Sequence, residues 1–399
     1  MSTSSPVPPV APPVVPPVVP LGVLDLVPIS SGSNPSTAVR NSIDLAVATE
    51  GLGYSRYWFA EHHLNPGVGG TSPTVMIALA AGRTSSIRLG SGGVQSGHRT
   101  ALSIVEEFGL LDAAHPGRID LGVGRSGGRN FLKDRLRGVS SNGSSNGQPP
   151  PQATVTDDGL LIPTRPSLKH LANSPRLALT AALLQQEEAV TPAYADLMGD
   201  IVSLLEGTYR SDDGLDPHPV PGTCAEVEVW VLGSSAGESA AVAGALGLRF
   251  AANYHVSPST ILEAVEAYRE AFVPSRWLDR PHIAVSADVV VAPDDESARE
   301  AAAGFGLWVL GIRSGQGAAP YPHPDEARAH AWTPEERVLV ADRVDTQFVG
   351  SPSTVAAGLR ALQQSTGADE IVVTTATHDH RDRVRSYRLL AEEWFATTG

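Results

Sequence analysis

The chain has 399 residues, of which 42% are apolar and 18% charged, and this composition is typical of a globular protein with a large core. Lysine and arginine number 29 against 43 aspartate and glutamate, so the net charge of −14 argues against binding to nucleic acid or to an anionic membrane. A single cysteine, Cys224, excludes an internal disulfide and metal sites built from cysteines. No apolar run could cross a membrane and the start does not resemble a signal peptide, so we expect a cytoplasmic protein.

Two segments are expected to lie outside regular structure. Residues 1–20 contain eight prolines and six valines, which predicts a disordered tail. A stretch rich in Ser, Asn, Gly and Pro at 138–152 predicts a mobile loop, and we expect 130–190 to be a mobile or disordered insertion or lid. Residues 21–399 are expected to form one domain.

Between these segments, short β-branched runs alternate with amphipathic ones in chain order. Helix starts are predicted at Asn34, Ser72, Thr100, Gly237 and Ser351, where a capping residue or a proline precedes an apolar pattern. Eight strand-plus-helix units predict parallel pairing and a (β/α)8 TIM barrel with a long insertion after strand four, whereas a doubly wound open sheet is the alternative. The expected strands are Leu21–Val27, Arg56–Ala60, Ile87–Val94, Arg118–Val123, Glu226–Leu232, Leu248–Ala252, His282–Val291 and Glu370–Thr375.

Glu61, His62 and His63 follow directly after the second expected strand, at the end where a barrel carries its functional residues. A carboxylate beside two imidazoles suits general acid–base chemistry or a flavin pocket, although a solvated surface cluster would give the same letters.

Glycines follow the third and fourth strands. Gly92 and Gly93 would let a flat ligand lie against bare backbone, although a tight corner of the chain would also explain them. Residues 122–127 match the GxGxxG pattern of dinucleotide-binding loops, but that motif belongs in the first strand–helix unit and needs an acidic residue about 20 positions later. We expect instead a turn, including Gly127, that presents Arg125 to an anion.

Small residues surround the helix start after the fifth strand. Ser234, Ser235, Gly237 and Ser239 would leave backbone N–H groups free for a phosphate, which the helix dipole also favours. Ordinary capping by Ser235 would account for one of these serines. Glu238 does not suit a phosphate site, and we expect it to point outward.

Further histidines follow the sixth and eighth strands, at His255, His378 and His380. His378 and His380 could ligate a metal together with His62 or His63, which makes a metal-dependent barrel hydrolase an alternative function. Solvated histidines at a helix start are the simpler interpretation.

These segments resemble the bacterial-luciferase-like flavin monooxygenases over residues 21–128 and 225–395. Their Gly- and Ala-rich composition resembles the actinomycete subgroup typified by the mensacarcin-pathway monooxygenase, which implies a role in secondary metabolism and antibiotic biosynthesis. The resemblance rests on residues 56–63 (RYWFAEHH), 69–73 (GGTSP), 89–94 (LGSGGV), 105–125 (VEEFGLLDAAHPGRIDLGVGR), 231–251 and 348–359.

The resemblance implies a TIM barrel that binds FMN as FMNH2, which a separate NAD(P)H:flavin reductase delivers. It implies a C4a-hydroperoxide formed with O2, which hydroxylates or epoxidises a small-molecule organic substrate such as an aromatic polyketide. Relatives are often homodimers. A deazaflavin (F420)-dependent oxidoreductase shares this barrel and is the leading alternative, and a flavoprotein that only stores or senses flavin is another.

The same resemblance implies roles for single residues. His62 matches the catalytic imidazole beside the flavin, and Glu61 and His63 match its neighbours. The pair Gly92–Gly93 matches a non-prolyl cis peptide beneath the ring. The phosphate grip is matched by Arg125, Ser235 and Ser239. Light-emitting members carry a reactive cysteine where this chain has Gly124, so light emission is not expected.

Overall fold

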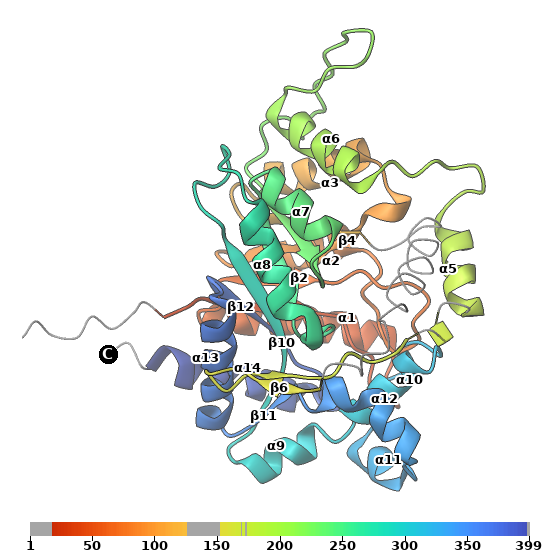
Figure 1. Cartoon of the computed structure of the whole chain (residues 1–399), viewed down its shortest axis with the longest axis vertical. Coiled ribbons are helices and arrows are strands. Elements are labelled where there is room, and N and C mark those ends of the chain that lie inside the picture. The colour runs from red at the N-terminus through yellow and green to blue at the C-terminus, as the bar shows by residue number, and fades with distance from the viewer. Residues whose placement is uncertain (1–17, 126–151, 169, 172–173, 397–399) are drawn as a thin grey trace, which may run out of the picture.

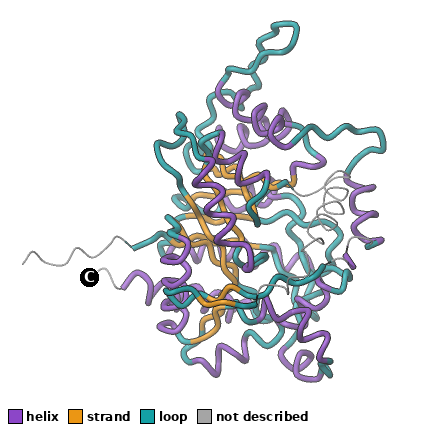
Figure 2. Tube along the Cα trace, viewed as in Figure 1, coloured by secondary structure: helices purple, strands orange, loops and turns teal. Residues whose placement is uncertain are grey.

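A closed barrel of eight parallel strands forms the centre of the molecule (Figures 1 and 2). The computed structural model describes residues 18–125, 152–168, 170–171 and 174–396. Each barrel strand pairs with the next one along the chain, and the last pairs with the first, which confirms the predicted (β/α)8 barrel. The barrel strands are β1 (Leu21–Asp25), β2 (Arg56–Phe59), β3 (Arg88–Ser91), β5 (Ile119–Gly124), β8 (Glu228–Gly233), β9 (Arg249–Asn253), β10 (Ile283–Val291) and β12 (Glu370–Thr374).

Helices cover the outside of the barrel and bury one face each against it (Figure 2). They begin where the sequence predicts, because the side chains of Asn34, Thr100 and Ser351 accept hydrogen bonds from the first turn of their helices. The covering helices are α1 (Pro35–Gly51), α2 (Pro73–Ala81), α3 (Ala101–Ala114), α6 (Tyr194–Glu206), α7 (Glu238–Ala245), α8 (Ile261–Ala271), α13 (Pro352–Thr366) and α14 (His380–Ala396).

The barrel interior is layered, because every second residue of a strand faces inward. Trp58 and Trp230 fill the middle with their ring centroids 5.0 Å apart. At the amino ends of the strands, Arg56 binds Glu370 through Nε at 2.7 Å and Nη2 at 2.9 Å, and also pairs with Asp120. This buried ion network closes one end, so only the end at the strands' carboxyl termini is left to form a site.

Part of the expected insertion is ordered. A hairpin of β6 (Thr154–Val155) and β7 (Leu161–Ile162) lies within 130–190, and α5 (Pro175–Leu184) follows it. The hydroxyl of Tyr254, just after β9, donates to the Leu161 carbonyl at 2.7 Å, which fixes the hairpin to the barrel. Residues 126–151 lie outside the described residues, and mobility of the insertion stays a prediction.

The last three residues of the tail expected at 1–20 belong to the described part of the chain. Residues 18–20 lie against the barrel, since Trp394 donates to the Val19 carbonyl at 2.8 Å and the Pro20 carbonyl accepts from Ile371. Residues 1–17 lie outside the described part of the chain.

A second insertion, which the sequence did not reveal, lies between β10 and β12. Its helices gather at one end of the molecule (Figure 1), and it brings side chains of α10 and α12 to the barrel mouth. The remaining elements are β4 (Val94–Gln95), β11 (Phe348–Gly350), α9 (Asp295–Ala301), α10 (Phe305–Arg313), α11 (Pro324–Ala329) and α12 (Pro334–Val344).

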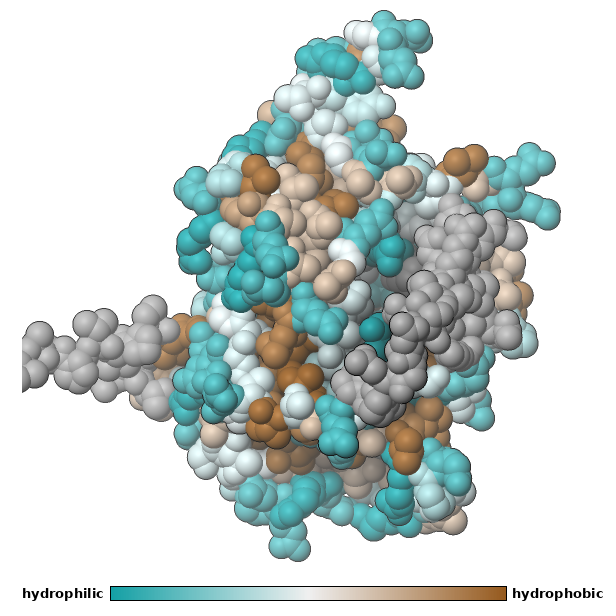
Figure 3. Space-filling model, in the orientation of Figure 1, coloured by the Kyte–Doolittle hydropathy of each residue, from teal (hydrophilic) through white to brown (hydrophobic). Residues whose placement is uncertain are grey.

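On the face that Figure 3 shows, apolar residues form patches along the middle of the molecule, and hydrophilic residues lie around them. Among the described residues, no helix combines the length and the apolar character that crossing a membrane requires.

Candidate active site at the barrel mouth

Glu61 is the centre of a buried polar cluster at the end of β2. Its Oε1 atom lies 2.8 Å from Nε2 of His63 and 3.3 Å from Nε2 of His98, and its Oε2 atom accepts from the Gln95 amide at 2.9 Å. Burial alone would raise the pKa of this carboxyl, but hydrogen bonds from His63, His98 and the Gln95 amide outweigh it and lower the pKa to about 2. Glu61 is therefore a permanent carboxylate that orients its neighbours.

His62 has a buried ring nitrogen to which no other described group is hydrogen-bonded. Its backbone N–H donates to the Gly70 carbonyl at 2.7 Å, which fixes the main chain, while among the described residues its Nδ1 atom is buried without a hydrogen-bond partner. Burial and the neighbouring His63 side chain lower the pKa of His62 to about 4, against the opposing effect of Glu61. The imidazole is neutral at pH 7 and can accept or donate a proton.

His98 and Arg99 belong to the same cluster, and the sequence analysis missed both. His98 ends the short 3-10 turn that follows β4, and Arg99 comes directly after it and places Nη2 3.7 Å from Glu61 Oε1. The usable signal was their position on the loop after the third strand, because the carboxyl ends of neighbouring parallel strands share one rim.

The histidines do not form the metal site considered as an alternative. His378 Nε2 lies 3.0 Å from the Ser31 carbonyl, and His380 Nε2 lies 2.9 Å from Asp44 of α1. In the described part of the chain, the group with metal-ligand spacing is instead Glu61 with His63 and His98. The guanidinium of Arg99 beside the same carboxylate disfavours a cation there.

The peptide between Gly92 and Gly93 is cis, as the resemblance implies. A Cβ atom on Gly92 would lie 2.5 Å from Cδ1 of Leu24, and one on Gly93 would lie 2.6 Å from the Gly122 carbonyl oxygen. Neither position accepts a larger residue without movement, so this corner requires two glycines.

Arg125 and the start of α7 come together at the opposite part of the rim. Glu238 is exposed, and its carboxylate pairs with Arg125, whose Nη1 atom lies 2.8 Å from Oε2 of Glu238. Both side chains are about 40% exposed, and an exposed pair of this kind contributes little stability and is easily exchanged for another anion.

The amino end of α7 has no side-chain cap. Gly237 is the capping residue and its position leaves no side chain to accept from the helix, so Ser235 does not act as the cap. Ser239 lies in the first turn, and the Ser234 carbonyl is held by the hydroxyl of Thr260. Gly127 lies outside the described residues. The uncapped N–H groups, the serines and Arg125 form a donor set that fits a phosphate group.

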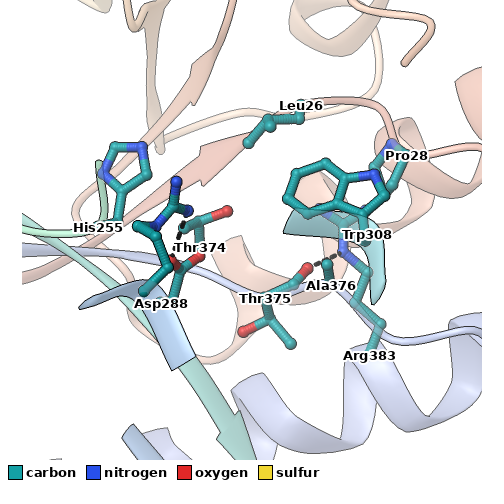
Figure 4. Close-up of a pocket in the computed structure, with 10 residues that line it drawn as sticks. Leu26, Pro28, His255, Asp288, Trp308, Thr374, Thr375, Ala376 and Arg383 are labelled. Carbon is teal, nitrogen blue, oxygen red and sulfur yellow. Dashed lines mark hydrogen bonds and ion pairs between the residues drawn. The ribbon is translucent and has the colours of Figure 1, made fainter. Parts of the chain in front are cut away.

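A recess opens in the mouth on the side of β1, β9, β10 and β12 (Figure 4). Its volume is about 20 Å³, close to the room that one water-sized group needs. Side chains from the second insertion, Trp308 of α10 and Arg343 of α12, complete it. The other lining residues are Leu26, Pro28, His255, Asp288, Thr374, Thr375, Ala376 and Arg383.

The molecule is a (β/α)8 barrel with its candidate site at the carboxyl ends of the strands. This site combines a cis Gly92–Gly93 peptide with the unpartnered imidazole nitrogen of His62. The family model of the luciferase-like monooxygenases matches residues 19–138 and 191–370, so the chain belongs to that family and is an oxidoreductase.

Curated relatives match over nearly the whole chain. The uncharacterized protein YvbT of Bacillus subtilis is 34% identical over 374 residues, which cover 94% of this chain and 96% of that protein. A luciferase-like monooxygenase of Escherichia coli K12 is 30% identical, with 92% and 94% covered.

Solved structures agree with this assignment. The apo form of MsnO8 superposes with a TM-score of 0.73 at 30% identity and covers 94% of this chain and 98% of its own, which supports the expected subgroup. The oxygenating constituent of 3,6-diketocamphane monooxygenase of Pseudomonas putida, solved in complex with FMN, has a TM-score of 0.58 at 18% identity, with 94% and 98% covered, and shows the shared fold alone.

Proposed function

We propose that this chain is an FMNH2-dependent monooxygenase that uses O2 to hydroxylate or epoxidise a small organic molecule, with the reduced flavin supplied by a separate NAD(P)H:flavin reductase. The observation that carries the proposal is the occurrence, on one barrel rim, of a buried imidazole with an unpartnered nitrogen and an uncapped helix start beside an exposed arginine.

The phosphate of FMN would bind at the start of α7. Backbone N–H groups of the first turn, the hydroxyls of Ser235 and Ser239, and the guanidinium of Arg125 are the donors that a phosphate requires. Arg125 would exchange its carboxylate partner for the phosphate or share it.

The flavin ring would lie over the cis Gly92–Gly93 peptide, toward His62. When bound in its reduced form, the cofactor supplies the electrons that activate O2. The neutral His62 side chain holds or moves a proton at its Nδ1 atom, and Glu61 keeps the surrounding imidazoles in place. The apolar barrel core below the mouth excludes water from beneath.

Binding of each cofactor to the purified protein tests this proposal. Structures of similar fold include the FMN complex above and an F420-dependent secondary alcohol dehydrogenase at 14% identity, so both cofactors must be compared. We expect FMNH2 to bind and to be oxidised by O2 with oxygen transferred to the substrate. Tight binding of reduced F420 with no reaction with O2 would favour hydride transfer instead.

A further inference from the structure

The recess at the mouth has an apolar side and a polar side. Figure 4 shows Trp308, Pro28 and Leu26 on one side and His255 with Asp288 on the other. Trp308 is 5% exposed, so only the part of its indole that lines the recess can contact a ligand. A ligand group that enters the recess must therefore be small, with an apolar side toward these residues and a polar atom toward His255 and Asp288.

The polar side carries no net charge. Nη2 of Arg343 lies 2.9 Å from Oδ2 of Asp288, and Nη2 of Arg383 lies 2.7 Å from Oδ1 of Asp25, so both guanidinium groups are balanced. His255 is neutral at pH 7, because burial and, to a smaller extent, the nearby Arg343 guanidinium lower its pKa to about 3. A charged ligand group would enter a nearly dry site without a counter-charge, which is costly.

One donor in this neutral site has no acceptor. The Arg343 side chain is 8% exposed, and its Nε atom is buried without a hydrogen-bond partner among the described residues. A buried donor left unpaired costs about 1–3 kcal/mol, so an acceptor atom placed beside it is strongly favoured. Because the recess has room for about one water-sized group, that acceptor must be a single terminal atom.

Two features of the lining residues fix the shape of the recess. Nδ1 of His255 lies 2.6 Å from the Ser286 hydroxyl, which holds the ring in place. Val27 adopts φ of 56°, a conformation that a β-branched residue rarely takes, and its two neighbours Leu26 and Pro28 both line the recess.

We propose that this recess binds one uncharged terminal oxygen of the organic substrate, a ketone carbonyl or a hydroxyl. Nε of Arg343 donates to that oxygen, and the carbon that carries it contacts the apolar side of the recess at Leu26, Pro28 and Trp308. The proposal rests on the proposed function, since it names the substrate class of the same mouth: neutral, oxygen-bearing molecules rather than carboxylates or plain hydrocarbons.

Three probes of matched shape test this in the full-length protein without flavin: acetophenone, benzoate and ethylbenzene, each titrated by calorimetry. We expect acetophenone to bind about tenfold or more tightly than the other two, since one hydrogen bond to a charged donor is worth that much. Equal affinity of acetophenone and ethylbenzene, or tighter binding of benzoate, would overturn the proposal.

Variants then locate the site. Ala376→Leu fills the recess and should abolish the preference for the ketone, and unchanged binding in this variant would show that the recess holds only water. The double variant Arg343→Met/Asp288→Asn removes the donor while the recess stays neutral, and should reduce acetophenone binding to that of ethylbenzene. Arg337→Met, an exposed position on the same helix, is the matched control.

One further measurement distinguishes failure of the recess proposal from failure of the proposed function. FMN binding is measured on the same samples by fluorescence quenching. Loss of the ketone preference with intact FMN binding would remove the recess but keep the proposed cofactor. A ketone preference without any FMN binding would leave the recess standing and contradict the proposed function.

Discussion

Glu61 and Gln95 are joined twice: the Gln95 backbone N–H donates to Glu61 Oε2 at 2.9 Å, and the Gln95 side-chain amide donates to the Glu61 carbonyl at 2.8 Å. Gln95 is also paired in register with Gly124, the residue before Arg125. The loop that carries His62 is thereby connected through β4 to the strand that carries Arg125. The proposed acid–base residue and the proposed phosphate ligand thus belong to one continuous rim, as binding of a single flavin requires.

Replacement of the free imidazole should separate cofactor binding from chemistry. We expect His62→Ala to bind FMN with little change but to lose product, with the electrons of FMNH2 released as hydrogen peroxide, because proton management fails while the phosphate site is intact. Product and peroxide yields measured in one assay check this. His380→Ala, at a histidine paired with Asp44 on the outside of the barrel, is the control. Wild-type yields in His62→Ala would remove His62 from the mechanism.

Arg125→Ala should weaken FMN about tenfold or more and leave riboflavin almost unaffected, because only FMN carries the phosphate that the guanidinium would bind. Fluorescence titration with the two flavins measures the difference. Arg280→Ala is a matched control, since this arginine also forms an exposed pair, with Asp369 at 2.9 Å, at the other end of the barrel. Equal loss for FMN and riboflavin would contradict a phosphate role.

The pH dependence of stability should report the buried state of His62. Its pKa is about 6.5 when the chain is unfolded and about 4 when folded, so below pH 6.5 the unfolded chain binds the additional proton and stability falls as pH falls. The loss approaches about 1.4 kcal/mol per pH unit for this one group between pH 6 and 4.5.

His62→Gln should therefore show a shallower decline than the wild type in urea unfolding between pH 7 and 5. Glu61 does not contribute in this range, because its pKa of about 2 and its ordinary value of 4.5 both lie below it. Above pH 7 the two proteins should have parallel profiles. Parallel profiles below pH 6 as well would show that His62 is solvated.

The ion network at the closed end of the barrel should matter for stability rather than binding. Arg56→Met leaves Glu370 and Asp120 without their main partner in a buried site, so we expect a loss of about 3–5 kcal/mol in the free energy of unfolding. Arg40→Met, on the exposed face of α1, should change it by less than about 0.5 kcal/mol. A small effect of Arg56→Met would mean that water reaches this end of the barrel.

Local patterns predicted the fold well. Most barrel strands are short apolar runs, and the predicted helix starts at Asn34, Ser72, Thr100 and Ser351 carry a proline or a capping side chain, so neighbouring residues largely determine these elements. The EHH cluster could be located because its position after a strand places it on the rim.

Residues brought in by distant segments could not be predicted in this way. Arg343 reaches the mouth from an insertion whose helices have no signal relating them to the barrel, and Glu238 turns to Arg125 only because strands β5 and β8 are neighbours. His98, which follows β4, contacts Glu61, which follows β2. Its neighbours in the sequence, Gly97 and Arg99, resemble an ordinary loop. Such contacts depend on register and closure of the barrel.

Stopped-flow mixing of the FMNH2-bound protein with O2 tests the central claim most directly. The account predicts a transient species with an absorbance distinct from both reduced and oxidised FMN, long-lived in the wild type and short-lived in His62→Ala. Direct conversion of FMNH2 to oxidised FMN, at the rate seen in buffer and without difference between the two proteins, would contradict it.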